Sequence, residues 1–78
     1  GRDRVMRNAL IAAGNSGDRS LVPAIERLLD DASPLVRAMA VWALQRLLPA
    51  DAWDGAKARH VSHETDVAVQ AEWGAEAV

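Results

Sequence analysis

Apolar side chains recur every three or four positions through the first 48 residues, a spacing that gathers them on one face of a helix. The first helix is expected from Arg4 to Ala13, with Asp3 in place as its N-terminal cap. Gly14 is expected to end this helix. The stretch from Gly14 to Asp18 predicts a tight turn, because its glycines and asparagine accept positive φ angles. A second helix is expected from Leu21 to Leu29.

The stretch from Asp30 to Pro34 marks the sharpest boundary in the sequence. Ser33 suits the N-cap position, and Pro34 suits the first helical position, where its missing N–H costs little. The helix that begins here is expected to run to Leu48, and Pro49 then ends it. Its apolar face is expected to contain Leu35, Val36, Met39, Ala40, Ala43, Leu44 and Leu47.

The hydrophobic pattern weakens after this helix. Asp51 can cap a short helix that passes through Trp53 and is interrupted by Gly55. Asp66 can cap a last helix. The apolar residues of that last helix are Val67, Val69 and Trp73.

An internal repeat is visible when the helix starts are superposed. The start at Asp3 matches the start at Ser33 at an offset of 30 residues, and the start at Asp66 matches it at an offset of 33. Helix pairs that recur at such an interval are typical of an α-solenoid, in which each pair covers the apolar face of its neighbour. The expected fold is therefore all-α, a short α-solenoid. Residues 1–48 would form its helical repeats, and residues 49–78 a degenerate capping repeat with an acidic C-terminal tail of the same domain.

Composition limits the chemistry of this domain. Its 78 residues include no cysteine, which excludes disulfides, iron–sulfur clusters and thiolate zinc sites within the chain. His60, His63 and Glu64 fall short of the ligand set of a metal site, and no catalytic constellation is recognisable, so the chain is not expected to be an enzyme. No apolar run reaches the roughly 18 residues of a membrane span, so a cytoplasmic protein is expected.

Residues 4–48 resemble one particular family. The segments that carry the resemblance are Arg7 to Asp18 (RNALIAAGNSGD), Val22 to Ala24 (VPA), Ser33 to Arg37 (SPLVR) and Trp42 to Leu44 (WAL). They are similar to the C-terminal HEAT-like repeat region of the epoxyqueuosine reductases, which complete queuosine synthesis on tRNA. The resemblance implies a non-catalytic accessory domain. Its partners would be tRNA and the catalytic region of the parent protein, and it is that region which uses [4Fe–4S] clusters and cobalamin.

Arginines at the start of two helices are the candidate contacts to nucleic acid. Arg7 and Arg37 occupy equivalent positions in the repeat, so stacking of the helices would bring them onto one ridge. Guanidinium groups bind phosphate oxygens through paired hydrogen bonds, and an asparagine nearby can add bonds to sugar or phosphate. The complete candidate set is Arg2, Arg4, Arg7, Asn8 and Arg37.

Two alternatives remain open from the sequence. Arg7 and Arg37 can instead form ion pairs with nearby aspartates and brace the turns between helices. The aspartates in question are Asp18, Asp30 and Asp31. The second alternative concerns the whole domain, which can act as a HEAT-like protein-interaction module, because a short solenoid leaves an apolar end uncovered. That end would dock on a partner or on a second copy of the chain.

Overall fold

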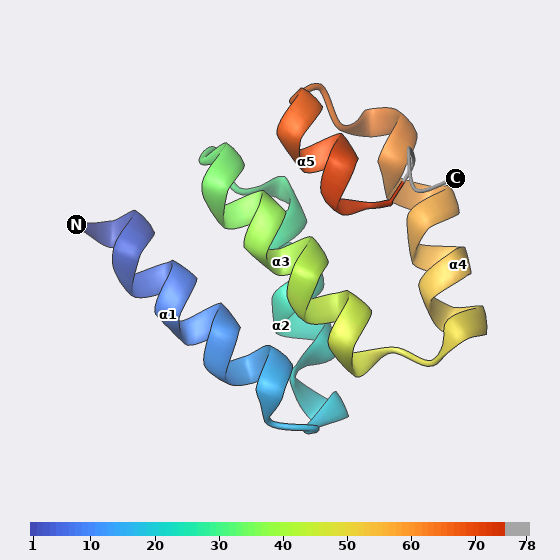
Figure 1. Ribbon diagram of the computed structural model, residues 1–78, viewed down its shortest axis with the longest axis horizontal. Coiled ribbons are helices and arrows are strands. Elements are labelled where there is room, and N and C mark those ends of the chain that lie inside the picture. The colour runs from blue at the N-terminus through green and yellow to red at the C-terminus, as the bar shows by residue number, and fades with distance from the viewer. Residues whose placement is uncertain (75–78) are drawn as a thin grey trace.

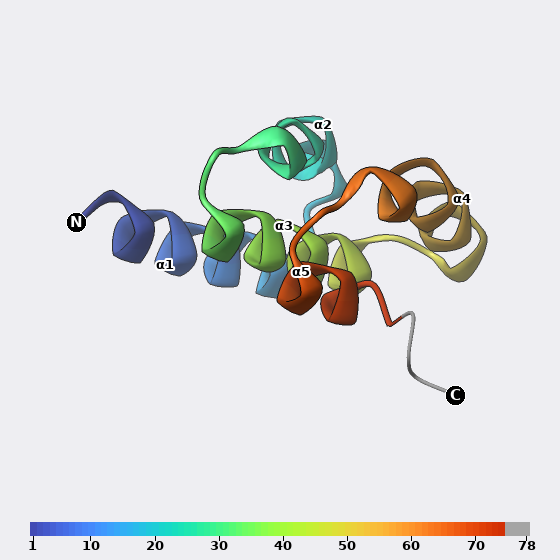
Figure 2. The ribbon, with the colours of Figure 1, turned by 90° about the horizontal axis from the view of Figure 1, so that it is seen from above.

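The computed structural model describes residues 1–74, which form two layers of helices (Figure 1). The first layer contains three helices that run side by side in one direction, α1 (Arg2–Asn15), α3 (Pro34–Leu47) and α5 (Val67–Glu72). The second layer contains α2 (Val22–Arg27) and α4 (Ala50–His60) (Figure 2). Short 3-10 turns connect them, η1 (Arg19–Leu21), η2 (Leu28–Asp30) and η3 (Val61–His63). The chain thus alternates between layers, which confirms the short α-solenoid.

Helix α3 is the centre of the core. It lies between α1 and α5 and contacts α2 in the second layer. Its buried side chains are Val36, Ala40, Val41, Ala43, Leu44 and Leu47. The buried core residues outside α3 are Leu10, Ile25, Leu29, Ala56, Val69 and Trp73. Full burial of one large aliphatic side chain stabilises a fold by about 1.5–3 kcal/mol, so α3 makes a large contribution to the stability of this small domain.

Two helix starts lie where the sequence placed them. The Ser33 hydroxyl accepts a hydrogen bond from the Val36 N–H at 3.4 Å, and α3 follows directly. The Asp66 carboxylate accepts hydrogen bonds from the N–H groups of Ala68 and Val69, at 2.9 and 3.1 Å. Both capping residues satisfy N–H groups that the first turn of a helix leaves without an intrahelical acceptor.

Replacing Asp66 with alanine is expected to lower the free energy of unfolding by about 1 kcal/mol, the usual cost of losing an N-cap. Urea denaturation monitored by circular dichroism measures it. Asp54→Ala is the control, because Asp54 is an exposed residue in the middle of α4 and caps nothing. Equal losses in the two variants would contradict the capping role.

The first turn of α1 and the second helix differ from expectation. Helix α1 begins one residue before Asp3, so Asp3 is not its cap. Its carboxylate instead accepts a hydrogen bond from the Ser33 hydroxyl at 2.9 Å, which links α1 to the start of α3. The helix expected from Leu21 to Leu29 is shorter, because η1 and η2 replace its ends. Asp18 caps η1 by accepting a hydrogen bond from the Ser20 N–H.

The expectation that Gly14 ends α1 is wrong. The helix continues to Asn15, and Gly14 is buried within its last turn. A Cβ atom on Gly14 would lie 2.6 Å from the ring carbon Cζ3 of Trp42 and 3.2 Å from the Cα of Ala43. Glycine is therefore required here by the close approach of α1 and α3. The positive φ that the turn needs is supplied by Gly17, at 72°.

The interruption expected at Gly55 is also wrong. Helix α4 is continuous through this residue and starts after Pro49, which occupies the N-cap position in place of Asp51. Helix α3 ends at Leu47, one residue before the expected position. Residues 50–74 pack on the core, where Trp73 is only 2% exposed and stacks on Trp53 with 5.1 Å between ring centroids. The final residues of the expected tail, 75–78, lie outside the described part of the chain.

Candidate functional site

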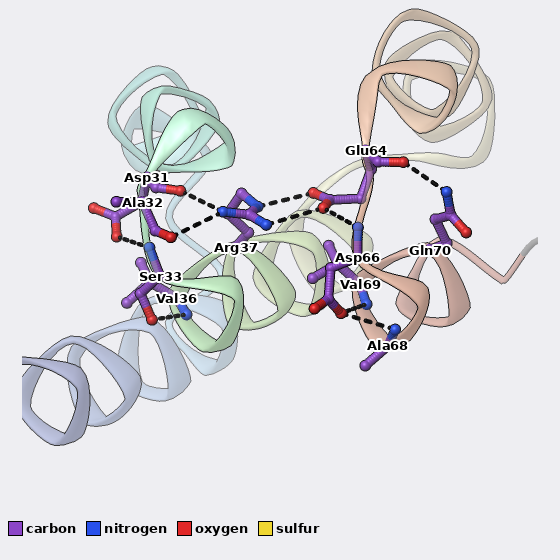
Figure 3. Close-up of polar contacts among 10 residues, drawn as sticks. All are labelled: Asp31, Ala32, Ser33, Val36, Arg37, Glu64, Asp66, Ala68, Val69 and Gln70. Atoms are coloured by element: carbon purple, nitrogen blue, oxygen red, sulfur yellow. Dashed lines mark hydrogen bonds and ion pairs between the residues drawn. The ribbon is translucent and has the colours of Figure 1, made fainter.

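Arg37 connects the loops that precede α3 and α5 (Figure 3). Its Nε and Nη2 atoms donate hydrogen bonds to the two carboxylate oxygens of Glu64, at 3.0 and 3.1 Å. Its Nη1 donates to the backbone carbonyl oxygens of Asp31 and Ala32, at 2.7 and 3.2 Å. Both side chains are largely buried, since 16% of Arg37 and 7% of Glu64 are exposed. Arg37 therefore braces one inter-repeat loop against the next.

Both members of this pair have pKa values shifted toward the charged form. Burial by itself would raise the pKa of Glu64. The hydrogen bonds from Arg37 and from the Asp66 N–H outweigh burial, so the pKa of Glu64 is lowered. The hydrogen bond to Glu64 raises the pKa of Arg37 above its ordinary value. The ion pair is therefore fully formed at neutral pH.

The loops before α3 and α5 share one design. Asp31 and Glu64 each lie two residues before a capping residue and accept a hydrogen bond from its N–H. Each also accepts hydrogen bonds from an arginine on the preceding helix of the first layer, Asp31 from Arg2 and Glu64 from Arg37. Gln70 occupies the position of Arg37 one repeat later. Its Nε2 donates to the Glu64 carbonyl oxygen at 2.6 Å, as Arg37 donates to that of Asp31.

The candidate nucleic-acid contacts predicted from the sequence fall into two groups. The group on α1 is exposed and contains Arg2, Arg4, Arg7 and Asn8. Arg2 pairs with Asp31, and this hydrogen bond lowers the pKa of the Asp31 carboxyl. Arg4 and Arg7 form no ion pair with a carboxylate within residues 1–74. The second group is Arg37 alone, whose Nε, Nη1 and Nη2 atoms all donate to Glu64 or to loop carbonyls.

Glu64 is the residue of this network that sequence reasoning missed. Its signal was its position, two residues before Asp66, which matches the position of Asp31 before Ser33. The repeat offset of 33 relates the two acids as it relates the two caps. An acidic residue that recurs at the repeat offset, together with an arginine on the preceding helix of the first layer, indicates an ion pair between repeats.

Within residues 1–74, the hollow beside this network is too small for a cofactor. A hollow of about 50 Å³ is lined by Leu29, Asp30, His60, His63, Glu64 and Trp73. Ligand pockets are usually about 300 Å³ or larger. The His60 ring stacks on Trp73 with 6.0 Å between centroids. Over the range 1–74 no three His, Cys, Asp or Glu side chains are placed to hold a metal ion.

Trp42 on α3 contacts both a cation of its own helix and the backbone of α1. The guanidinium carbon of Arg46 lies 5.5 Å from the ring centroid of Trp42, a cation–π distance. Trp42 is half-buried, because one side of its ring covers Gly14 on α1. Arg46 has no role in the sequence-based predictions.

Comparison with known proteins gives one match. A family profile described as HEAT repeats matches residues 2–73, a span that includes every helix from α1 to α5. No curated protein and no solved structure matches the chain. None of the helices in residues 1–74 is both long enough and apolar enough to cross a bilayer.

Proposed function

Because the chain belongs to the HEAT-repeat family, we propose that it is a non-catalytic interaction module that holds tRNA beside the catalytic region of an enzyme resembling epoxyqueuosine reductase. The clusters and cobalamin of such an enzyme would be bound by that region. This chain has no cysteine to ligate a cluster, and the hollow of about 50 Å³ within residues 1–74 is too small for a corrinoid. Its contribution is therefore to binding and orientation.

The exposed cations of α1 carry this proposal. Arg4 and Arg7 project into solvent without a carboxylate partner among the described residues, so their guanidinium groups are available to phosphate oxygens. Asn8 directly follows Arg7 and adds an amide donor, and Arg2 lies two residues before Arg4. Arg37 acts as a positioning residue, because its hydrogen bonds to Glu64 and the loop carbonyls fix α3 relative to α5.

Fluorescence anisotropy of labelled tRNA at several salt concentrations tests the proposal. The slope of log K against log salt is expected to lie near −2 to −4, since each phosphate contact contributes about 0.7–0.9. In the double variant Arg4→Ala/Arg7→Ala the slope should become shallower by about 1.5, as expected for two lost contacts.

The matched control is Arg19→Ala/Arg27→Ala. It removes the same charge from exposed arginines on η1 and α2, which belong to the second layer. Binding close to that of the unchanged protein is expected for the control. Equal weakening by both double variants would mean that only net charge matters and would contradict a tRNA site on α1.

A second candidate function is a protein-interaction module that docks on a partner or self-associates. Its support is that large apolar residues are exposed on all three helices of the first layer. Val5 is 66% exposed on α1, Leu35 is 44% exposed on α3, and Val67 is 79% exposed on α5. These three side chains give the first layer exposed apolar surface that a partner would cover.

A further inference from the structure

A continuous row of side chains on α3 borders α1. Leu35, Met39, Trp42 and Arg46 follow one another at intervals of four, three and four residues, which places them on one face of the helix. Trp42 lies against Gly14 of α1, so this face adjoins α1. The row remains accessible, because Leu35 and Arg46 are exposed and the two residues between them are half-buried.

A matching row runs along α1. Ile11 lies about one turn before Gly14, and Asn15 directly follows Gly14. Arg4 and Asn8 continue the row toward the start of the helix at the same spacing of four, three and four. We name the two rows together the α1–α3 seam. No described helix covers the side of the first layer that faces away from α2 and α4 (Figure 2).

The seam has an unusual composition for a solvent-exposed surface. Its α3 row is apolar except for its last residue, and its α1 row offers amide groups. Its charges are exclusively positive, Arg4 near one end and Arg46 at the other, and neither pairs with a carboxylate within residues 1–74. Tryptophan, methionine and arginine are the side chains enriched at protein interfaces, where they anchor binding.

We infer that the α1–α3 seam binds an amphipathic helix with acidic residues from a partner protein. The inference rests on the second candidate function and gives it a surface and a partner chemistry. An apolar stripe on the partner would cover Leu35, Met39 and Trp42. Carboxylates on the partner would pair with Arg46, drawn from its contact with Trp42, and with Arg4.

Helix geometry sets the spacing of those carboxylates. The repeat offset of 30 aligns Arg4 with position 34 of α3, so Arg46 lies twelve positions farther along a parallel helix. At about 1.5 Å per residue the two cations are about 18 Å apart along the axis, which a partner helix spans in about three turns. RNA fits the seam less well, because phosphates make no use of its apolar row.

A pair of synthetic helical peptides tests this inference on the full chain. Both carry an apolar stripe of three leucines, and they differ only in having two glutamates or two lysines about eleven residues apart, the three-turn spacing of the seam. Isothermal titration calorimetry is expected to show binding of the glutamate peptide and at least about tenfold weaker binding of the lysine peptide, a difference of about 1.4 kcal/mol. Equal binding of the two peptides, or binding of neither, would overturn the inference.

Variants then locate the binding surface. Arg46→Glu should weaken binding of the glutamate peptide about tenfold and strengthen binding of the lysine peptide. The substitution replaces a positive charge, which attracts glutamate, with a negative charge, which repels glutamate and attracts lysine. Leu35→Gln should weaken both peptides. The controls are Arg27→Glu on α2 and Ala58→Gln on α4, exposed residues outside the seam. Weakening by the controls equal to that by the seam variants would place the peptide elsewhere and refute the inference.

The same variants separate this inference from the tRNA proposal. Arg7 belongs only to the proposed tRNA contacts, and Arg46 only to the seam. Loss of peptide binding in Arg46→Glu with tRNA binding retained supports the seam as a protein site. If Arg46→Glu instead weakens tRNA and leaves the glutamate peptide unaffected, the seam is a nucleic-acid contact and the inference fails. Circular dichroism melting of each variant verifies that these exposed substitutions leave the fold intact.

Discussion

Replacing Gly14 with alanine is expected to destabilise the domain by about 2 kcal/mol, even though alanine is the better helix former by about 1 kcal/mol. The added Cβ would approach the Trp42 ring to 2.6 Å and the backbone of α3 at Ala43 to 3.2 Å. The ring can shift, but the backbone of the central helix can do so only by separating α1 from α3. Thermal denaturation should therefore show a melting temperature lower by about 10 °C, given 4–8 °C per kcal/mol at this chain length.

Two comparison variants isolate the steric cause. Gly55→Ala is the matched control, because its Cβ would meet only the mobile end of Arg59, at 3.3 Å, in an uninterrupted helix. It should stabilise the domain by about 0.5–1 kcal/mol. In a Trp42→Ala background, Gly14→Ala should cost less, because the 2.6 Å approach to the ring is gone while the 3.2 Å approach to the Ala43 Cα remains. A similar cost in both backgrounds would show that the ring is not the cause.

The two glycines also show where sequence reasoning stops. The sequence predicts a helix end at Gly14 and an interruption at Gly55, because glycine is a poor helix former and is frequent at helix C-termini. Gly14 is nevertheless helical because Trp42, distant in sequence, covers it. Gly55 is helical because α4 buries Ala56 in the core. Contacts between distant segments outweigh local propensity at both sites, and no local pattern records them.

Features that depend on local chemistry were predicted well. The caps at Ser33 and Asp66 follow from short side chains that bond to the next turn, and both precede a helix in the structure. The repeat offsets of 30 and 33 correctly predicted parallel helices in one layer. The start of α1 was placed wrongly, because Asp3 turns its carboxylate to Ser33 of the next repeat.

The candidate site was predicted only in part. Arg7 and Arg37, which the repeat offset pairs, have different surroundings in the structure. Arg37 is held by Glu64 and by the loop before α3, whereas Arg7 is exposed and Asp31 is occupied by Arg2. Which of two arginines reaches a given carboxylate depends on where each lies along its helix and on how the helices are oriented. Neither can be read from repeat spacing alone.

Replacing Arg37 with methionine is expected to lower the free energy of unfolding by about 3 kcal/mol. This loss exceeds the cost of losing a surface ion pair, about 0–1 kcal/mol, and lies at the lower end of the cost of breaking a buried pair, about 3–5 kcal/mol. The Glu64 carboxylate would remain 7% exposed with the Asp66 N–H as its main donor, and the Asp31 and Ala32 carbonyls would lose theirs. Arg7→Met, the same change at the equivalent but exposed position, should alter stability by less than about 0.5 kcal/mol. Urea denaturation at pH 7 compares the two variants.

The pH dependence of this loss distinguishes an ion pair from simple packing. The folded-state pKa of Glu64 lies below its ordinary value of 4.5, so its contribution to stability is complete above that value. As pH falls through the lowered folded pKa, the carboxyl is protonated and the contribution disappears. The stability difference between the unchanged protein and Arg37→Met should therefore be largest near neutral pH and shrink below about pH 4. A difference that stays constant down to pH 3 would mean that Arg37 stabilises the loops through its carbonyl contacts and its hydrocarbon chain, with no contribution from the charge of Glu64.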